Sequence, residues 1–259
     1  MADALFEQDG PVAWVTMNRP AARNGMNAEM LDRMTRILQG VANDSDVRVV
    51  VLRGAGTDFS VGADLRGLSG QDAGDDRGDQ ELADVFELPV LLHEMPQITI
   101  AAVRGACAGA ALALACACDL RVCADTGLFR TAFAAVGVAG DMSGAWTLPR
   151  LVGSGQARAL FLLNERIGPE RALAMGLVSH VIPGPTFDEE VAAMAARIAG
   201  WPPLGLRAMK ANFLDAETES LAAYTRVETA RHLELLATED VKEAALAFLE
   251  KRPPRFQGR

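Results

Sequence analysis

Residues 98–124 read ITIAAVRGACAGAALALACACDLRVCA, and this stretch decides the fold. An apolar, partly β-branched run at 98–103 enters a turn of small residues, which opens into an Ala-rich run at 108–118. A second apolar run follows at 120–124. The first and last runs predict buried strands, and the Ala-rich run predicts a helix. Strand, helix and strand in this order are typical of an α/β protein with a parallel sheet.

The same alternation continues on both sides of this stretch. Short apolar and β-branched runs predict strands at 11–17, 47–52 and 178–182. Helical patterns predict helices at 27–41 and 84–94. Asn27 is expected to cap the first helix. A Gly- and Asp-rich segment at 68–81 is expected to be a mobile surface loop. From 188 to 249 the pattern is mostly helical, so we expect an α/β body followed by a helical tail.

The composition narrows the possible functions. The formal net charge is −9 and aromatic residues make up 5% of the 259 residues, which disfavours a basic or base-stacking nucleic-acid surface. The longest apolar run, 106–118, is too short to cross a bilayer. The first ten residues lack the basic and apolar regions of a signal peptide. We therefore expect a cytoplasmic protein with no nucleic-acid or membrane partner.

The four cysteines lie at 107, 116, 118 and 123, all inside the central apolar stretch. The stretch contains no CxxC motif and no histidine, so a zinc site is disfavoured. Free cysteine is among the most buried residue types. We expect these four to be small buried thiols, with no metal bound.

Two turns carry the candidate chemistry, one at 59–64 (FSVGAD) and one at 104–111 (RGACAGAA). Each follows a predicted buried strand and consists of small residues that let a ligand approach the backbone. Helix N-termini present unpaired N–H groups. Two such turns facing one point would form an oxyanion hole from main-chain groups alone. The alternative is that the small residues serve only tight packing.

Segments along nearly the whole chain resemble the crotonase superfamily, the enoyl-CoA hydratase/isomerase family. The matching segments, in family order, are NRPAARNGMN (18–27), VVLRGAGTDFSVGADL (50–65), the central stretch 98–124, LPRLVG (148–153), AMGLVSHVI (174–182) and AFLEKRPPRF (247–256). The resemblance implies an α/β spiral of ββα units with a C-terminal helical region for trimerisation. It implies a crotonase-like core at 1–195, a helical region at 196–259, and a homotrimer or dimer of trimers.

The resemblance also implies a chemistry. The substrate would be an acyl-CoA thioester, without a metal or redox cofactor. The N–H groups of Ala63 and Ala110 would bind the thioester oxygen and stabilise an enolate. The other residues implied to contact the substrate are Arg23, Gly25, Val61, Gly62, Asp64, Leu65, Gly109, Phe133, Trp146, Phe248 and Lys251. Of these, Phe248 and Lys251 would reach the CoA of a neighbouring subunit.

One departure from the family pattern affects the reaction. The two positions where hydratases of the family carry catalytic glutamates are Ala113 and Phe133, and no Glu occurs between Glu94 and Glu165. Neither side chain can transfer a proton, and general acid–base catalysis needs a titratable group in reach. Asp141 remains, at a position where some isomerase-type and dehalogenase-type relatives carry a catalytic Asp.

We therefore predict double-bond isomerisation of an enoyl-CoA, with Asp141 as the base in an apolar site that raises its pKa. A 2-enoyl-CoA hydratase and a non-catalytic acyl-CoA-binding protein are the alternatives. A dehalogenase-like reaction with Asp141 as the nucleophile is a more distant one. Asp141 could also serve only as a turn or capping residue, as Asp often does.

Overall fold

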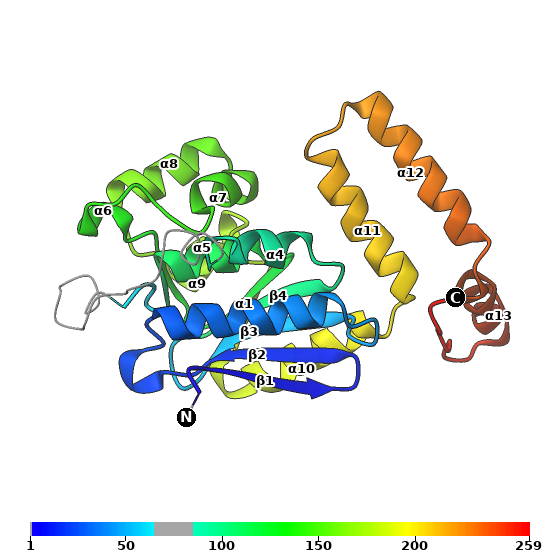
Figure 1. Cartoon of the computed structure of the whole chain (residues 1–259), viewed down its shortest axis with the longest axis horizontal. Helices are drawn as coiled ribbons and strands as arrows, with labels where there is room; N and C mark the ends of the chain where they lie inside the picture. The colour runs from blue at the N-terminus through cyan, green and yellow to red at the C-terminus, as the bar shows by residue number, and fades with distance from the viewer. Residues whose placement is uncertain (1, 65–84) are drawn as a thin grey trace.

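The computed structural model describes residues 2–64 and 85–259. Leu65 and the predicted loop at 68–81 lie outside these residues. The chain forms an α/β body from which the last helices extend as an arm (Figure 1). Among the described residues, no helix combines the length and the apolar character that crossing a membrane requires.

The body is built on one mixed sheet. Its strand order is β1-β2-β3-β4-β6-β8, with β1 (Ala4–Asp9), β2 (Val12–Met17), β3 (Val49–Gly54), β4 (Ile98–Val103), β6 (Leu120–Ala124) and β8 (His180–Ile182). The β1–β2 pair is antiparallel, and the other pairs are parallel. The five predicted strands are confirmed. The edge strand β1 escaped prediction because most of its side chains are exposed, so it carries little hydrophobic signal.

Helices cover both faces of this sheet. Alternate residues of the buried strands point to opposite faces, so Val50 and Leu52 contact one core, whereas Val49 and Val51 contact the other. The first core lies under α1 (Ala28–Ala42), α4 (Leu88–Glu94) and α5 (Ala110–Ala117). The second lies under α10 (Phe187–Ala199). The sequence pattern of a strand apolar on both faces follows from this layering.

The predicted cap of α1 is confirmed, since the Asn27 side chain accepts a hydrogen bond from Met30 N at 2.9 Å. The remaining elements of the body are short. They are the two-stranded sheet β5 (Ala106–Ala108) and β7 (Leu128–Arg130), the 3₁₀ turns η1 (Pro20–Ala22) and η2 (Gly184–Thr186), and the helices α6 (Phe133–Val136), α7 (Gly144–Val152), α8 (Ser154–Leu163) and α9 (Pro169–Ala174).

The arm consists of α11 (Pro203–Ala216), α12 (Leu221–Leu236) and α13 (Glu239–Glu250). The expected boundary at 195/196 falls within α10, which packs on the sheet, and the division into two domains stays a prediction. Lys210 ties α11 to the body, because its buried ammonium group donates to the carbonyls of Leu92 and Gln97 and lies 2.8 Å from Asp119 Oδ2.

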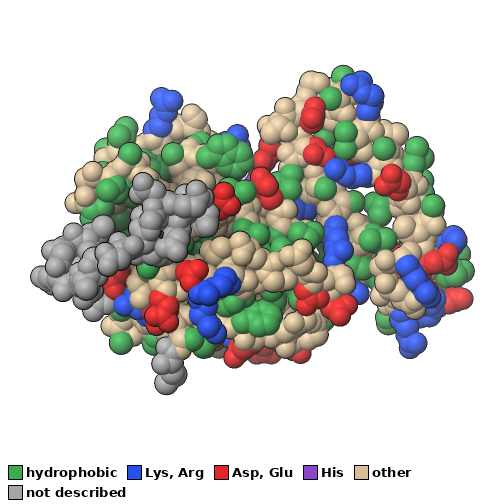
Figure 2. All heavy atoms as spheres, viewed as in Figure 1, with side chains coloured by type: hydrophobic (Ala, Val, Ile, Leu, Met, Phe, Trp, Pro, Cys, Tyr) green, Lys and Arg blue, Asp and Glu red, His purple; other side chains and the backbone are tan. Residues whose placement is uncertain are grey.

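The arm leaves much apolar surface uncovered within one chain. Helix α12 has no buried residue among those described, and Phe213 and Leu221 are 74% and 81% exposed. Figure 2 shows hydrophobic side chains along this arm. Exposed apolar surfaces are typical of contact sites for a protein, a membrane or a ligand.

Candidate active site

In the first predicted turn, an isolated β-bridge between Met26 and Ala63 positions the N–H group of Ala63. Met26 pairs with Ala63 in parallel, so Met26 N donates to Gly62 O at 2.8 Å and Asp64 N donates to Met26 O at 2.9 Å. In a parallel bridge of this register, the N–H of the opposite residue points away from its partner. The N–H of Ala63 therefore makes no hydrogen bond with another described residue.

The second turn positions the N–H of Ala110. Gly109 adopts φ 56° and ψ −127°, a conformation that favours glycine, and α5 begins at the next residue. The first N–H groups of a helix have no partner within it. The N–H of Ala110 makes no hydrogen bond with another described residue and lies at the positive end of the α5 dipole.

The structure brings the two turns into contact. Ser60 forms a parallel bridge with Cys107, with Ser60 N donating to Ala106 O at 2.9 Å. Gly62 has φ +91°, and a Cβ built on it would lie 2.6 Å from Ala108 O and 3.5 Å from Ala110 N. Only glycine permits this approach. The residue before Ala63 thus lies against the start of α5, so the two turns that carry the predicted donors are adjacent.

The positions of the missing glutamates lie beside the Asp141 turn. A Cβ on Gly140 would lie 3.4 Å from the Phe161 ring and 4.0 Å from the Phe133 ring. A Cβ on Gly144 would lie 3.0 Å from Ala113 Cβ. Phe133 stacks on Phe161, with ring centroids 5.7 Å apart. Asp141 therefore lies between Gly140, which is near Phe133, and Gly144, which is near Ala113. Ala113 itself lies about one helical turn after Ala110.

The carboxyl group of Asp141 is desolvated. Its Oδ1 is buried and has no hydrogen-bond partner among the described residues. Burial raises the pKa of this carboxyl above its usual range, because removal of water disfavours the charged form. A buried acceptor without a partner costs about 1–3 kcal/mol.

The backbone around Asp141 is also unusual. Gly140 has φ +127°, and the non-glycine residues Met142 and Ser143 have φ 46° and 60°. Consecutive left-handed residues that are not glycine are uncommon and cluster at functional sites. The turn is closed by Gly144 N, which donates to Asp141 O at 3.0 Å, so Asp141 is its first residue, as the turn alternative expects. The alternative role of Asp141 as a capping side chain has no support, since α7 has no side-chain cap.

Several residues that the resemblance implies contact the substrate lie together near the first turn. Arg23 is left-handed at φ 52° and its guanidinium pairs with Asp58 at 2.8 Å. This pairing lowers the pKa of the Asp58 carboxyl. Val61 N donates to Arg23 O, Gly25 lies against the Asp64 side chain, and the Asp64 carboxylate pairs with Arg19 at 3.0 Å. Leu65 lies outside the described residues.

Trp146 lies apart from this cluster. Its ring makes an edge contact with His93 and lies under the Arg150 guanidinium, on the wall of a cavity of about 840 Å³ that α11 also lines. The His93 ring lies 3.1 Å from the Glu217 carboxylate. The structure therefore places Trp146 between the body and the arm, and its expected contact with the substrate stays a prediction.

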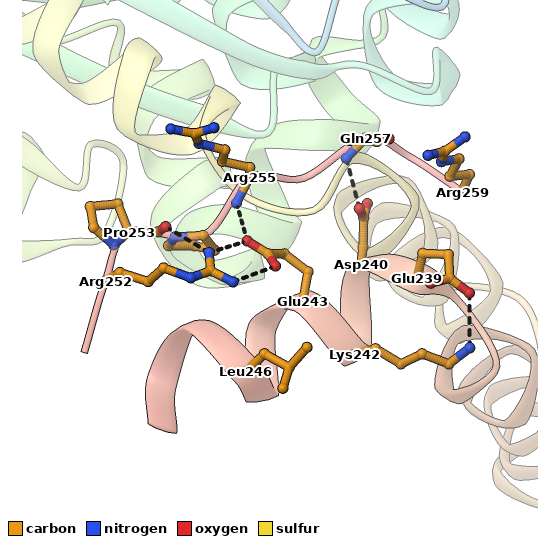
Figure 3. A pocket seen from close by; sticks show the side chains of 11 residues that line it. Glu239, Asp240, Lys242, Glu243, Leu246, Arg252, Pro253, Arg255, Gln257 and Arg259 are labelled. Carbon is orange, nitrogen blue, oxygen red and sulfur yellow. Dashed lines mark hydrogen bonds and ion pairs between the residues drawn. The ribbon is translucent and has the colours of Figure 1, made fainter. Parts of the chain in front are cut away.

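Phe248 and Lys251 lie together at the end of α13, and Phe248 is 84% exposed. Figure 3 shows the tail after Lys251 folded back along α13. Glu243 binds the Arg252 guanidinium and Arg255 N, and hydrogen bonds from Arg252 lower its pKa to about 2. Both side chains are exposed on the arm, and their role toward another subunit stays a prediction.

The four cysteines are free and buried, which confirms the expectation of unpaired interior thiols. Burial raises the pKa of Cys116 and Cys118 to about 12, so both remain thiols at neutral pH. They are not candidates for nucleophiles.

Comparisons with known proteins found a matching family model, related sequences and similar solved structures. The family model described as "Enoyl-CoA hydratase/isomerase" matches residues 7–259. A Rhodobacter capsulatus protein named a probable enoyl-CoA hydratase is 35% identical over 98% of this chain and 97% of its own. The 1,2-epoxyphenylacetyl-CoA isomerase of Escherichia coli is 32% identical over 96% and 95%. A Thermobifida fusca structure in complex with acetoacetyl-CoA aligns with a TM-score of 0.84 and 33% identity over 91% and 95%.

Proposed function

Because the chain belongs to the enoyl-CoA hydratase/isomerase family, an enzyme family acting on CoA thioesters, we propose that it moves the double bond of an enoyl-CoA, with Asp141 as the base. The names of the relatives include both hydratase and isomerase. The choice between these reactions therefore depends on the side chains of this chain.

The proposed reaction is a proton transfer in two steps. The Asp141 carboxylate removes a proton from C2 of a 3-enoyl-CoA, and the C–H electron pair passes into the C1–C2 bond. The substrate becomes a dienolate whose negative charge lies largely on the thioester oxygen, and the N–H groups of Ala63 and Ala110 bind this oxygen. When the carbonyl reforms, the C3–C4 π electrons take the proton back from Asp141 at C4. The product is a 2-enoyl-CoA, and no redox cofactor is required because no net oxidation occurs.

The observation that carries this proposal is the state of Asp141. A carboxyl group with a buried, unpartnered oxygen and a raised pKa is a stronger base than an exposed carboxylate and is suited to accept and return a proton. The adjacent Ala113 and Phe133 cannot do so. Apolar neighbours would also keep water from the dienolate, which favours isomerisation over hydration.

The test compares wild type with Asp141→Asn on a 3-enoyl-CoA, followed by the rise in absorbance of the conjugated thioester. We expect turnover to fall at least about a hundredfold, which is the lower range for loss of a general base. Asp125→Asn is the matched control, since Asp125 binds Gly184 N on the surface. Full activity in Asp141→Asn would overturn the assignment.

Hydration of a 2-enoyl-CoA is the second candidate, favoured by the names of the relatives. Crotonyl-CoA separates the two reactions, because hydration removes the absorbance that isomerisation creates. Hydration faster than isomerisation in wild type would reverse our preference. Binding of several acyl-CoA thioesters in calorimetry without conversion would instead indicate a non-catalytic binding protein.

We also propose a cytoplasmic homotrimer, or a dimer of two such trimers, in which the arm packs on a neighbouring chain. The support is the apolar surface of the arm, where Phe213, Leu221 and Phe248 are at least 74% exposed. In such an assembly Phe248 and Lys251 would lie near the CoA of a neighbour.

A further inference from the structure

The Arg19 side chain contacts both segments of the β-bridge between Met26 and Ala63. Its Nη1 donates to Gly25 O, one residue before Met26. The same nitrogen lies 3.0 Å from Asp64 Oδ2, one residue after Ala63. One guanidinium group thus holds the two segments together, next to the first proposed oxyanion donor.

A chain of hydrogen bonds connects this guanidinium to the N–H of Ala63. Arg19 donates to the carbonyl of the Gly25–Met26 peptide, and the N–H of the same peptide, on Met26, donates to Gly62 O at 2.8 Å. Gly62 O belongs to the peptide whose N–H is on Ala63. Both peptides are trans, so in each of them the C=O and the N–H point in opposite directions. The chain therefore runs from Arg19 through two peptide groups to the Ala63 N–H.

Hydrogen bonds in series strengthen one another, because a donor that polarises the carbonyl of a peptide also polarises its N–H. The first donor of this chain is charged, and charge-assisted hydrogen bonds are about twice as strong as neutral ones. The Ala110 N–H lies at the positive end of the α5 dipole. The Ala63 N–H lies on an isolated β-bridge instead, and the chain from Arg19 supplies the corresponding support.

The guanidinium is held in place by the protein itself. Arg19 N donates to Asn24 Oδ1 at 2.9 Å, and Asn24 N donates to Arg19 O at 2.9 Å. Asn24 is fully buried, and its Nδ2 donates to Ala55 O and Asp58 O. The Arg19 Nε lies 3.4 Å from Asp3 Oδ2, and the side chain is only 19% exposed. A donor fixed in this way needs no reorganisation when negative charge develops at the site.

We propose that Arg19 is a positioning residue, which aims and polarises the Ala63 N–H through the Gly25–Met26 peptide. The Asp3 and Asp64 carboxylates offset the charge of Arg19 at longer range, so the effect is transmitted by the hydrogen bonds and not by the field of the cation. The assignment rests on the proposed function in one respect, the binding of a thioester oxygen by the Ala63 N–H. It does not depend on the choice between isomerisation and hydration.

The carbonyl stretching frequency of a bound thioester reports the strength of the oxyanion donors. The probe is butyryl-CoA labelled with carbon-13 at the thioester carbonyl, a saturated compound that cannot isomerise, and infrared difference spectroscopy compares it free and bound to the full chain. In wild type the carbonyl band should move to lower frequency on binding. In Arg19→Gln the band should return toward the frequency of the free thioester.

The same Arg19→Gln variant should turn over a 3-enoyl-CoA with a kcat about tenfold lower than wild type, which corresponds to about 1.4 kcal/mol. The loss is smaller than that for removal of a donor, because the Ala63 N–H remains. KM should change by less than about threefold, since the donors act mainly on the dienolate.

Arg48→Gln is the matched control. Arg48 is half-buried like Arg19 and donates to a main-chain carbonyl, Ala199 O, at 2.9 Å. It directly precedes β3, whereas the 59–64 turn follows the end of that strand. In a thermal melt this variant should lose stability as Arg19→Gln does, but it should keep the wild-type band and kcat.

Arg19→Lys retains a cationic donor but lacks the planar fork, so it should lie between wild type and Arg19→Gln in both band position and kcat. The two effects must occur together in any folded Arg19 variant, so either variant alone is a sufficient test. Thermal melts identify the variants that fold.

A wild-type carbonyl band in a folded Arg19 variant, or an equal change of the band in Arg48→Gln, would overturn the assignment and leave the proposed function intact. A displacement of the band that depends on Arg19, in a protein that does not turn over a 3-enoyl-CoA, would confirm the role of Arg19 and overturn the proposed function. No displacement of the band in wild type would overturn both.

Discussion

Gly62→Ala should separate the two oxyanion donors. Residue 62 has φ +91°, and an added Cβ would lie 2.6 Å from Ala108 O. Main-chain oxygen cannot rotate away as a side chain can, so the segment carrying Ala63 must move from the start of α5. The variant alters the proposed site without removing any polar side chain.

The expected cost has two parts. The strained backbone conformation costs about 1–3 kcal/mol in stability. Displacement of one oxyanion donor costs about 3–4 kcal/mol in the reaction barrier, or roughly 10²–10³ in kcat. Because the donors act mainly on the dienolate, KM should change much less than kcat.

The assay measures kcat and KM on a 3-enoyl-CoA, well below the melting temperature of the variant. Gly153→Ala is the control, since Gly153 has φ +80° and a Cβ there would meet nothing within 4 Å. It should share the loss of stability and keep kcat near the wild-type value. A Gly62→Ala enzyme with kcat within about threefold of wild type would refute the two-turn oxyanion hole.

Three further predictions concern the base, the arm and the assembly. The pKa of Asp141 is higher in the folded chain than in the unfolded chain, so folding stability falls as pH rises between the two pKa values. At pH 8 we therefore expect the free energy of unfolding of Asp141→Asn, measured in urea, to exceed that of wild type by about 1 kcal/mol. The difference should vanish in acid. Lys210→Met should destabilise the chain by about 3 kcal/mol in chemical denaturation, because the Asp119 carboxylate and two carbonyls lose a buried partner; a change below 0.5 kcal/mol would contradict the network. Phe213→Glu with Leu233→Glu should yield monomers in sedimentation at micromolar concentration, and an unchanged assembly would exclude these side chains from the interface.

The sequence pattern predicted the buried parts of the fold well. Val49 to Leu52 and the Ala-rich helix α5 are apolar on all sides because the structure covers them on all sides. Strand β1 and the three-residue strands β5 and β7 carry too few buried side chains for a periodic signal. Their positions depend on pairing with distant segments, which periodicity does not report.

The site was predictable to different degrees. Gly62 and Gly109 indicated main-chain chemistry because each stands at a turn of small residues. The contacts that Arg19 makes with Gly25 and Asp64 were missed, since they form only after two separate segments pair. The placement of Trp146 beside His93 was also missed, because α7 presents it toward α11 and not toward Asp141.

The donors of the proposed oxyanion hole belong to the peptide backbone, and this has a consequence for how the protein can evolve. A point mutation can exchange a side chain but cannot delete an N–H, except through proline. The two N–H donors therefore depend on the path of the backbone and are retained when a side chain such as that at position 113, 133 or 141 is exchanged. A lineage can in this way replace one proton-transfer reaction by another without passing through an ancestor that no longer holds its substrate.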